Sequence, residues 1–216
     1  MNLQESLDKL KEKIQSKLPA EYVEIMRGTT KKLEASGIGG SILKVGDKAP
    51  AFELPNQDGR LISSEQLLQT GPLILTFYRG VWCPYCNTDL AYLKRYEKEA
   101  SELGATMLSI SPQKPKFNQQ IIDQQRLGFD LLSDAHNDVA AAFGLRWELM
   151  DPLRSLYDKQ FNISLPAYNG DDSWTLPVPA RFIISTDGFI RYAEYSIDYT
   201  QRPNPDVLIR ELQKLG

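Results

Sequence analysis

The sequence is poor in cysteine and histidine: Cys83 and Cys86 are its two cysteines, and His136 is its single histidine among 216 residues. One closely spaced pair of cysteines cannot brace a disulfide-stapled scaffold of this length. A structural zinc site needs four Cys or His ligands, more than the chain has, so we expect no metal and no other cofactor. A catalytic triad would have to use His136, to which we assign no role.

The chain also lacks an excess of positive charge and any long apolar run. Lys and Arg number 25 against 28 Asp and Glu, a formal net charge of -3, which provides no basic field for nucleic acid. The first residues, MNLQESLDKLKEKIQSKL, lack the apolar core of a secretory signal, and no run approaches membrane-spanning length. We therefore expect a soluble protein that binds neither nucleic acid nor membrane and resides in a reducing compartment, most simply the cytoplasm.

The first part of the chain has the pattern of an appended helical segment. Apolar residues at spacings of three and four predict an amphipathic helix that Pro19 ends, followed by a second helix over residues 21–35. The apolar stripe of the first helix consists of Leu3, Leu7, Leu10, Ile14 and Leu18. We predict a helical extension over residues 1–40 and one domain over 41–216. The stripe either packs on that domain or pairs with a partner chain, so a homodimer stays open.

From Val45 onward the turn residues and apolar runs are typical of an α/β domain. The run from Leu73 to Tyr78, bounded by turn residues, predicts a strand buried on both faces. Residues 145–176 are less regular, and we predict a helical insertion with a covering loop there. The remaining predicted elements are helices over 84–103, 116–126, 137–143 and 206–215, strands over 105–111 and 129–132, and a hairpin of strands over 181–185 and 189–195.

The segment Cys83-Pro84-Tyr85-Cys86 follows the buried strand and opens the long helix. Proline suits the first helical position, which makes Cys83 the N-cap and Cys86 the third helical residue. We expect the Cys83 sulfur to lie at the rim of the sheet and to accept first-turn N–H groups, since the helix dipole favours a thiolate there. At this spacing the two cysteines can close a strained disulfide that forms and is reduced readily.

Redox chemistry is therefore preferred over half of a zinc site completed by another chain, or over inert buried thiols. The residues VGDKAPAF at 45–52 and FYRGVWCPYC at 77–86 resemble the peroxiredoxin (AhpC/TSA) family of the thioredoxin superfamily, and further matches extend the resemblance over roughly residues 43–197. The resemblance implies a thioredoxin-like fold with a central mixed β-sheet flanked by helices. It also implies reduction of hydroperoxides through a cysteine sulfenic acid.

The family signature Pro-x-x-x-Thr-x-x-Cys places Cys86 at the peroxidatic position, Cys83 at the Thr position and Arg79 at the Pro position. Cys83 then becomes a potential resolving cysteine. The family also has an arginine before a late strand, where this chain has Pro179. That proline looks instead like the cis-proline that faces the CxxC pair in thioredoxin-like proteins.

Two arginines are candidates for the missing cation. Arg79 or Arg181 is expected to stabilise a thiolate and to orient peroxide oxygens, although a surface ion pair is an equal alternative for each. Trp82 is expected to form a wall of the site beside Cys83.

Three functions are compatible with these residues. The leading hypothesis is an antioxidant thiol peroxidase in which Cys83 and Cys86 cycle between dithiol and disulfide, with thioredoxin, glutaredoxin or glutathione as electron donor. The position of Cys86 in the family signature favours Cys86 as the attacking thiolate, whereas exposure and N-cap chemistry favour Cys83. The second hypothesis is a thioredoxin- or glutaredoxin-like disulfide reductase. The third is a non-enzymatic redox sensor whose disulfide switches a surface formed by residues 145–176.

Overall fold

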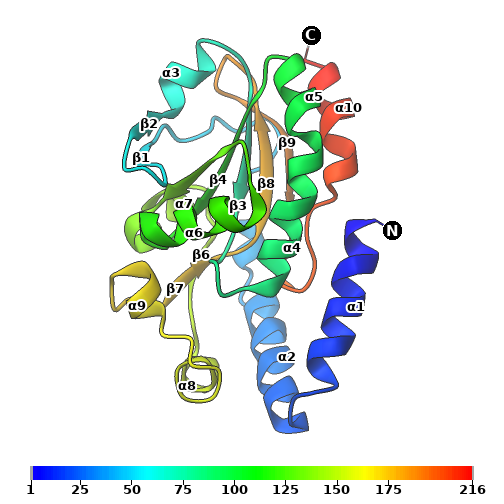
Figure 1. The fold of residues 1–216 in the computed structure, drawn as a ribbon, viewed down its shortest axis with the longest axis vertical. Helices are drawn as coiled ribbons and strands as arrows, with labels where there is room; N and C mark the ends of the chain where they lie inside the picture. The colour runs from blue at the N-terminus through cyan, green and yellow to red at the C-terminus, as the bar shows by residue number, and fades with distance from the viewer. Residues whose placement is uncertain (1, 216) are drawn as a thin grey trace.

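The computed structural model describes residues 2–215 and contains a mixed five-stranded sheet at its centre (Figure 1). The strand order is β5-β4-β3-β8-β9; β3, β4 and β5 are parallel, and β8 and β9 are antiparallel to their neighbours. These strands are β3 (Leu73–Phe77), β4 (Thr106–Ser111), β5 (Asp130–Ser133), β8 (Ala180–Ile184) and β9 (Ile190–Tyr195). The predicted α/β architecture is confirmed.

The central strand β3 is buried along its whole length, as its apolar run predicted. Successive side chains of a strand point to opposite faces, so Ile74 packs in one layer and Leu73, Leu75 and Phe77 in the other. In the ladder, Leu75 lies opposite Leu108 of β4 and Phe182 of β8. Because both faces of β3 are covered, the residues that follow it are fixed at the edge of the sheet.

Each face of the sheet has its own helical layer. The layer that contains Ile74 is built from α4 (Pro84–Leu93), α5 (Glu97–Glu102), α6 (Pro115–Gln125) and α10 (Leu208–Gln213). The other layer contains α3 (Ser64–Leu68), α7 (Asp138–Ala142) and the small antiparallel sheet of β1 (Glu53–Pro55) and β2 (Leu61–Ser63). The single helix predicted over 84–103 is instead α4 and α5 separated by a 3₁₀ turn, η2 (Lys94–Tyr96).

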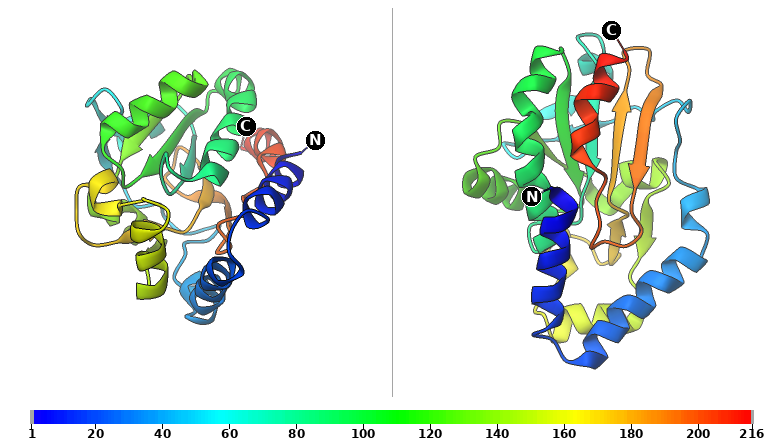
Figure 2. Two further views of the ribbon diagram at one scale, coloured as in Figure 1. Left: turned by 60° about the horizontal axis from the view of Figure 1, so that its bottom comes forward. Right: turned by 90° about the vertical axis from the view of Figure 1, so that its right-hand side faces the viewer.

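The N-terminal extension forms two helices, α1 (Leu3–Gln15) and α2 (Ala20–Ala35), followed by a 3₁₀ turn, η1 (Ile38–Gly40). Asn2 caps α1: its side chain accepts the Glu5 N–H at 2.8 Å, and Glu5 accepts the Asn2 N–H at 3.1 Å. Leu3 and Leu7 are buried in the same cluster as Leu93 of α4. The apolar stripe therefore packs on the chain's own domain, and Figure 2 shows α1 lying alongside it. A homodimer stays a prediction.

Residues 145–176 contain more regular structure than a helix and a loop. The helices α8 (Asp151–Lys159) and α9 (Leu165–Asn169) lie between two short antiparallel strands, β6 (Arg146–Glu148) and β7 (Thr175–Pro177). The remaining 3₁₀ turns are η3 (Ala135–Asn137) and η4 (Pro205–Val207). Leu153, Leu156 and Tyr157 of α8 share a cluster with Met26 of α2. The extension and the 145–176 segment thus meet at one end of the molecule (Figures 1 and 2).

Candidate active site

The two cysteines lie where β3 ends and α4 begins, as predicted, with Cys83 at the N-cap and Pro84 as the first helical residue. The loop between β3 and α4 needs a glycine at position 80. Gly80 has φ +149°, and a Cβ there would lie 2.6 Å from Trp82 Nε1. Both cysteines are free thiols, only 3 Å apart. The expectation of an exposed Cys83 is wrong, since Cys83 is 1% and Cys86 0% exposed.

The Cys83 sulfur makes no close capping hydrogen bond at the start of α4, but the backbone N–H of Cys86 in the first turn still contributes to lowering the pKa of Cys83, in the direction of the N-cap expectation. Its other partners are a thiol and an arginine: Cys83 and Cys86 hydrogen-bond to each other, and Arg202 Nη2 lies 3.9 Å from Cys83 Sγ. The same nitrogen donates to Cys86 Sγ at 2.9 Å, and the Arg79 backbone N–H donates to that sulfur at 3.4 Å. Both sulfurs therefore face one buried guanidinium.

Arg202 is the residue that sequence reasoning missed. It is 6% exposed, lies in the loop between β9 and α10, and is 116 residues from Cys86 along the chain. That loop has no apolar periodicity and no recognisable spacing to the cysteines. Nothing local in the sequence points to Arg202, because it reaches the sulfurs only through the tertiary fold.

Arg181 is connected to Arg202 through the Asp89 carboxylate and the Pro203 carbonyl. Its Nη2 donates to both carboxylate oxygens of Asp89 at 2.8 and 3.0 Å, and its Nη1 donates to the Pro203 carbonyl at 2.7 Å. Arg202 Nε lies 3.7 Å from the same carboxylate. The Asp89 carboxylate on α4 thus joins two buried arginines, and Arg181 is a structural partner of Arg202.

The two thiols have different proton affinities. Burial raises the pKa of Cys83, but the hydrogen bond from Cys86 and the charges of Arg79 and Arg202 outweigh it, so the pKa of Cys83 is lowered. For Cys86, burial and the hydrogen bond and charge of Cys83 raise the pKa well above the ordinary value. The pair therefore favours one thiolate, at Cys83, and one thiol, at Cys86, which shares its proton with Cys83.

Arg79 is enclosed by aromatic rings. Its guanidinium carbon lies 4.4 Å from the ring centroid of Tyr199, 4.9 Å from that of Trp82 and 5.6 Å from that of Tyr157. Its Nη2 donates to the Tyr157 hydroxyl. Within residues 2–215, its buried Nε has no hydrogen-bond acceptor, and the same holds for Nε of Arg202. Arg202 Nε still faces the Asp89 carboxylate at 3.7 Å, so Arg79 Nε is the one of these two donors that faces no carboxylate in the described chain.

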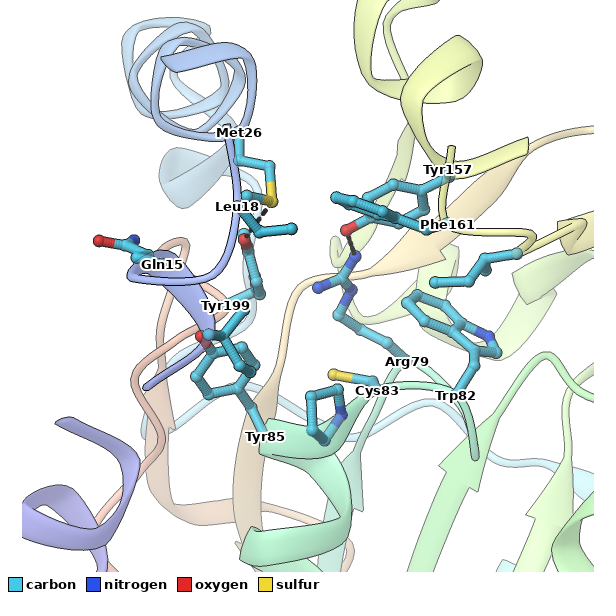
Figure 3. Close-up of a pocket in the computed structure, with 13 residues that line it drawn as sticks. Gln15, Leu18, Met26, Arg79, Trp82, Cys83, Tyr85, Tyr157, Phe161 and Tyr199 are labelled. Carbon is cyan, nitrogen blue, oxygen red and sulfur yellow. Dashed lines mark hydrogen bonds between the residues drawn. The ribbon is translucent and has the colours of Figure 1, made fainter. Parts of the chain in front are cut away.

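A cavity of about 200 Å³ lies against Cys83. In Figure 3, Cys83 and Arg79 lie between two walls, with Leu18 and Met26 on one side and Tyr157 and Phe161 on the other. The other lining residues are Ile14, Gln15, Trp82, Pro84, Tyr85, Ile163 and Tyr199; Cys86 is not among them. A molecule inside the cavity can therefore contact the side chain of Cys83 but not that of Cys86. Trp82 forms part of the wall beside Cys83.

Two expectations concern residues outside this cluster. The structure contains no cis peptide bond in its described part, so the expected cis-proline at Pro179 is wrong. Pro179 is buried, and its carbonyl accepts the Ser196 N–H at 2.9 Å. His136 is solvated, with a side chain 63% exposed that lies 3.8 Å from the Asp171 carboxylate.

Comparison with known proteins identifies the family. The AhpC/TSA family model matches residues 45–193, which is more than half of the chain. The chain belongs to the AhpC/TSA family. A putative peroxiredoxin, bcp, of Haemophilus influenzae is 35% identical over 122 residues, 56% of this chain and 77% of that protein. Peroxiredoxin Bcp of Escherichia coli is 32% identical over the same shares of the two chains.

Solved structures of the family share the fold. The crystal structure of peroxidoxin BcpB from Mycobacterium tuberculosis superposes with a TM-score of 0.63 and 25% identity, covering 81% of this chain and 99% of that one. The predicted thioredoxin-like fold is confirmed, and membership in a family of peroxiredoxins supports a thiol peroxidase. Among residues 2–215, no helix has the length and apolar character needed to cross a membrane.

Proposed function

We propose that the protein reduces hydroperoxides with the thiolate of Cys83 and resolves the product with Cys86. The observation that carries this assignment is the position of Cys83: its side chain lines the cavity, whereas Cys86 is fully buried behind it. A thiolate rather than a thiol is the nucleophile, and the two arginines favour the thiolate at Cys83.

In the first step the Cys83 thiolate attacks the terminal oxygen of the hydroperoxide. A sulfur–oxygen bond forms, the O–O bond breaks, and its electron pair leaves with the alkoxide, which takes a proton from solvent and becomes the alcohol. The sulfur is oxidised to a sulfenic acid, and the peroxide is reduced. The Nε donor of Arg79, which lines the cavity, is suited to stabilise negative charge on the departing oxygen.

In the second step the Cys86 sulfur attacks the Cys83 sulfenic acid. A disulfide forms, and the hydroxyl leaves as water with the proton of the Cys86 thiol. Because the two cysteines are already only 3 Å apart, little movement is needed to reach bonding distance. We propose that thioredoxin, glutaredoxin or glutathione then restores the dithiol, which places the cycle in a reducing compartment such as the cytoplasm.

A second assignment has two points in its favour. Cys86 holds the peroxidatic position that the family resemblance implies, and it accepts the shorter hydrogen bond from Arg202, at 2.9 Å against 3.9 Å. In this assignment Cys83 becomes the resolving residue. The chemistry of the cycle is unchanged, and only the order of the two sulfurs is reversed.

The disulfide reductase has weaker support than the peroxidase. A protein disulfide must approach the attacking sulfur closely, yet Cys83 is 1% exposed and lies behind the extension and α8. A sensor that switches residues 145–176 needs the same cysteine pair. Both alternatives are separated from the peroxidase by direct assay.

The assay uses two variants, Cys83→Ser and Cys86→Ser, with dithiothreitol as reductant. We expect Cys83→Ser to lose peroxide consumption almost completely. When Cys86→Ser is treated with peroxide after dithiothreitol has been removed, we expect it to accumulate a sulfenic acid on Cys83 that dimedone traps for mass spectrometry. A trapped sulfenic acid on Cys86 in an active Cys83→Ser variant would reverse the assignment. Insulin reduction without peroxide turnover would establish a reductase, and the absence of both activities would favour a sensor.

A further inference from the structure

One wall of the cavity comes from outside the part of the chain that matches the family model. Ile14, Leu18 and Met26 line the cavity, whereas the family match begins at residue 45. The opposite wall is formed by Tyr157 and Phe161. The shape of the space in front of Cys83 is therefore set by this chain's own extension together with the 145–176 segment.

The cavity is larger and less polar than hydrogen peroxide requires. Its volume is about 200 Å³, and its walls are formed mainly by aliphatic and aromatic side chains. An apolar cavity of about 150 Å³ is enough to bind benzene, whereas one water molecule occupies about 30 Å³ of liquid. Hydrogen peroxide is close to water in size and buries almost no apolar surface on entering such a cavity.

Direct contacts hold the two walls in place. The Tyr199 hydroxyl donates to Met26 Sδ at 3.3 Å, and the Tyr199 ring covers the Arg79 guanidinium at 4.4 Å. On the other side, Tyr22 of α2 packs edge-on against Phe161 with ring centroids 6.0 Å apart. The extension is thus tied both to the arginine at the sulfurs and to the opposite wall, as a preformed binding site requires.

We propose that the N-terminal extension is a specificity element that selects hydroperoxides with an apolar body about the size of one phenyl ring. This inference rests on the proposed peroxidase function. The hydroperoxy group meets Cys83 at the floor of the cavity, while the apolar body lies between Leu18 and Phe161. Burial of that body favours the organic substrate, because an apolar pocket contributes to binding in proportion to the surface it removes from water.

The test compares kcat/KM for cumene hydroperoxide with kcat/KM for hydrogen peroxide. We expect the full-length protein to prefer cumene hydroperoxide, and Leu18→Ala to lower the ratio of the two constants by about tenfold, the lower end of what lost aliphatic contact costs in specificity. The matched control is Leu10→Ala: Leu10 is also half-buried in the extension but does not line the cavity. Its ratio should equal that of the unmodified protein.

The outcomes separate the two proposals. If neither hydroperoxide is consumed, the peroxidase itself is refuted and the specificity falls with it. If both are consumed with equal constants, or if Leu10→Ala lowers the ratio as much as Leu18→Ala, only the specificity is refuted.

Binding of the product alcohol gives a readout that does not depend on turnover. Calorimetry with 2-phenyl-2-propanol and the Cys83→Ser variant should show saturable binding that Leu18→Ala weakens about tenfold in the same background. Absence of saturable binding, or binding that Leu18→Ala leaves unchanged, contradicts the inference even if the variant has lost peroxidase activity.

Discussion

Residues 45–193, which match the AhpC/TSA family model, supply both sulfurs, whereas the flanking segments supply the arginine nearest to them and one wall of the cavity. The core presents Cys83 at the start of a helix, as a thioredoxin-like sheet dictates. Arg202 and Leu18 reach the same place from opposite ends of the chain. The comparison indicates that the core supplies the sulfurs and the Arg79 cation, while the flanks add a second cation, Arg202, and one wall of the space in front of Cys83.

Asp89 connects core and flank through two buried arginines, Arg181 and Arg202, and its loss should have the largest effect on folding. Asp89→Asn leaves Arg181 and Arg202 buried without their carboxylate, and breaking a buried ion pair from one side costs about 3–5 kcal/mol. Urea denaturation of the reduced protein measures this cost. The exposed Asp172→Asn variant is the control and should be close to neutral. A loss below about 1 kcal/mol for Asp89→Asn would mean that the network does not hold the flank to the core.

Removal of the Arg202 cation should alter the reactivity of Cys83 more than the stability of the protein. Arg202→Gln removes a charge that lowers the pKa of Cys83, and a nearby opposite charge typically shifts a pKa by about 1–3 units. Above its pKa the thiol is a reactive thiolate, so iodoacetamide alkylation of the native protein persists down to the lowered pKa and then declines. In Arg202→Gln the decline should move to higher pH, and peroxide turnover at pH 7 should fall by up to about tenfold, as the thiolate fraction of Cys83 falls.

The control for this prediction is Arg210→Gln, which removes an exposed arginine of α10 whose Nε lies 3.6 Å from the Glu211 carboxylate. Its pH profile should match that of the unmodified protein. An unmodified protein whose alkylation begins only above pH 8.5, the ordinary range of a thiol, would show that neither arginine activates Cys83.

The sequence predicted the core and its chemistry for a physical reason. Strand β3, the turn at Gly80 and the N-cap at Cys83 depend on neighbouring residues, and periodicity and capping rules describe such local order well. Burial of Cys83 was not predictable in this way, because the residues that cover it are on α2 and α8. The arginine contact was missed for the same reason: Arg202 is distant in sequence, and its guanidinium donates to Cys86 Sγ at 2.9 Å and lies 3.9 Å from Cys83 Sγ.

A substitution in the N-terminal extension should have the smallest effect, and it tests whether the extension and the core open independently. Asn2 caps α1, and Asn2→Ala should cost about 1 kcal/mol in the stability of that helix. Hydrogen exchange should then accelerate in α1 while β3 keeps its protection, because local opening and global unfolding are distinct processes. The matched control is Asp8→Ala, which changes an exposed residue of the same helix outside the cap.

If the extension shapes the cavity, Asn2→Ala should lower the preference for cumene hydroperoxide slightly and leave the alkylation profile of Cys83 unchanged. Equal acceleration of exchange in α1 and β3 would mean that the two regions unfold as one unit and that the flank cannot be tuned independently.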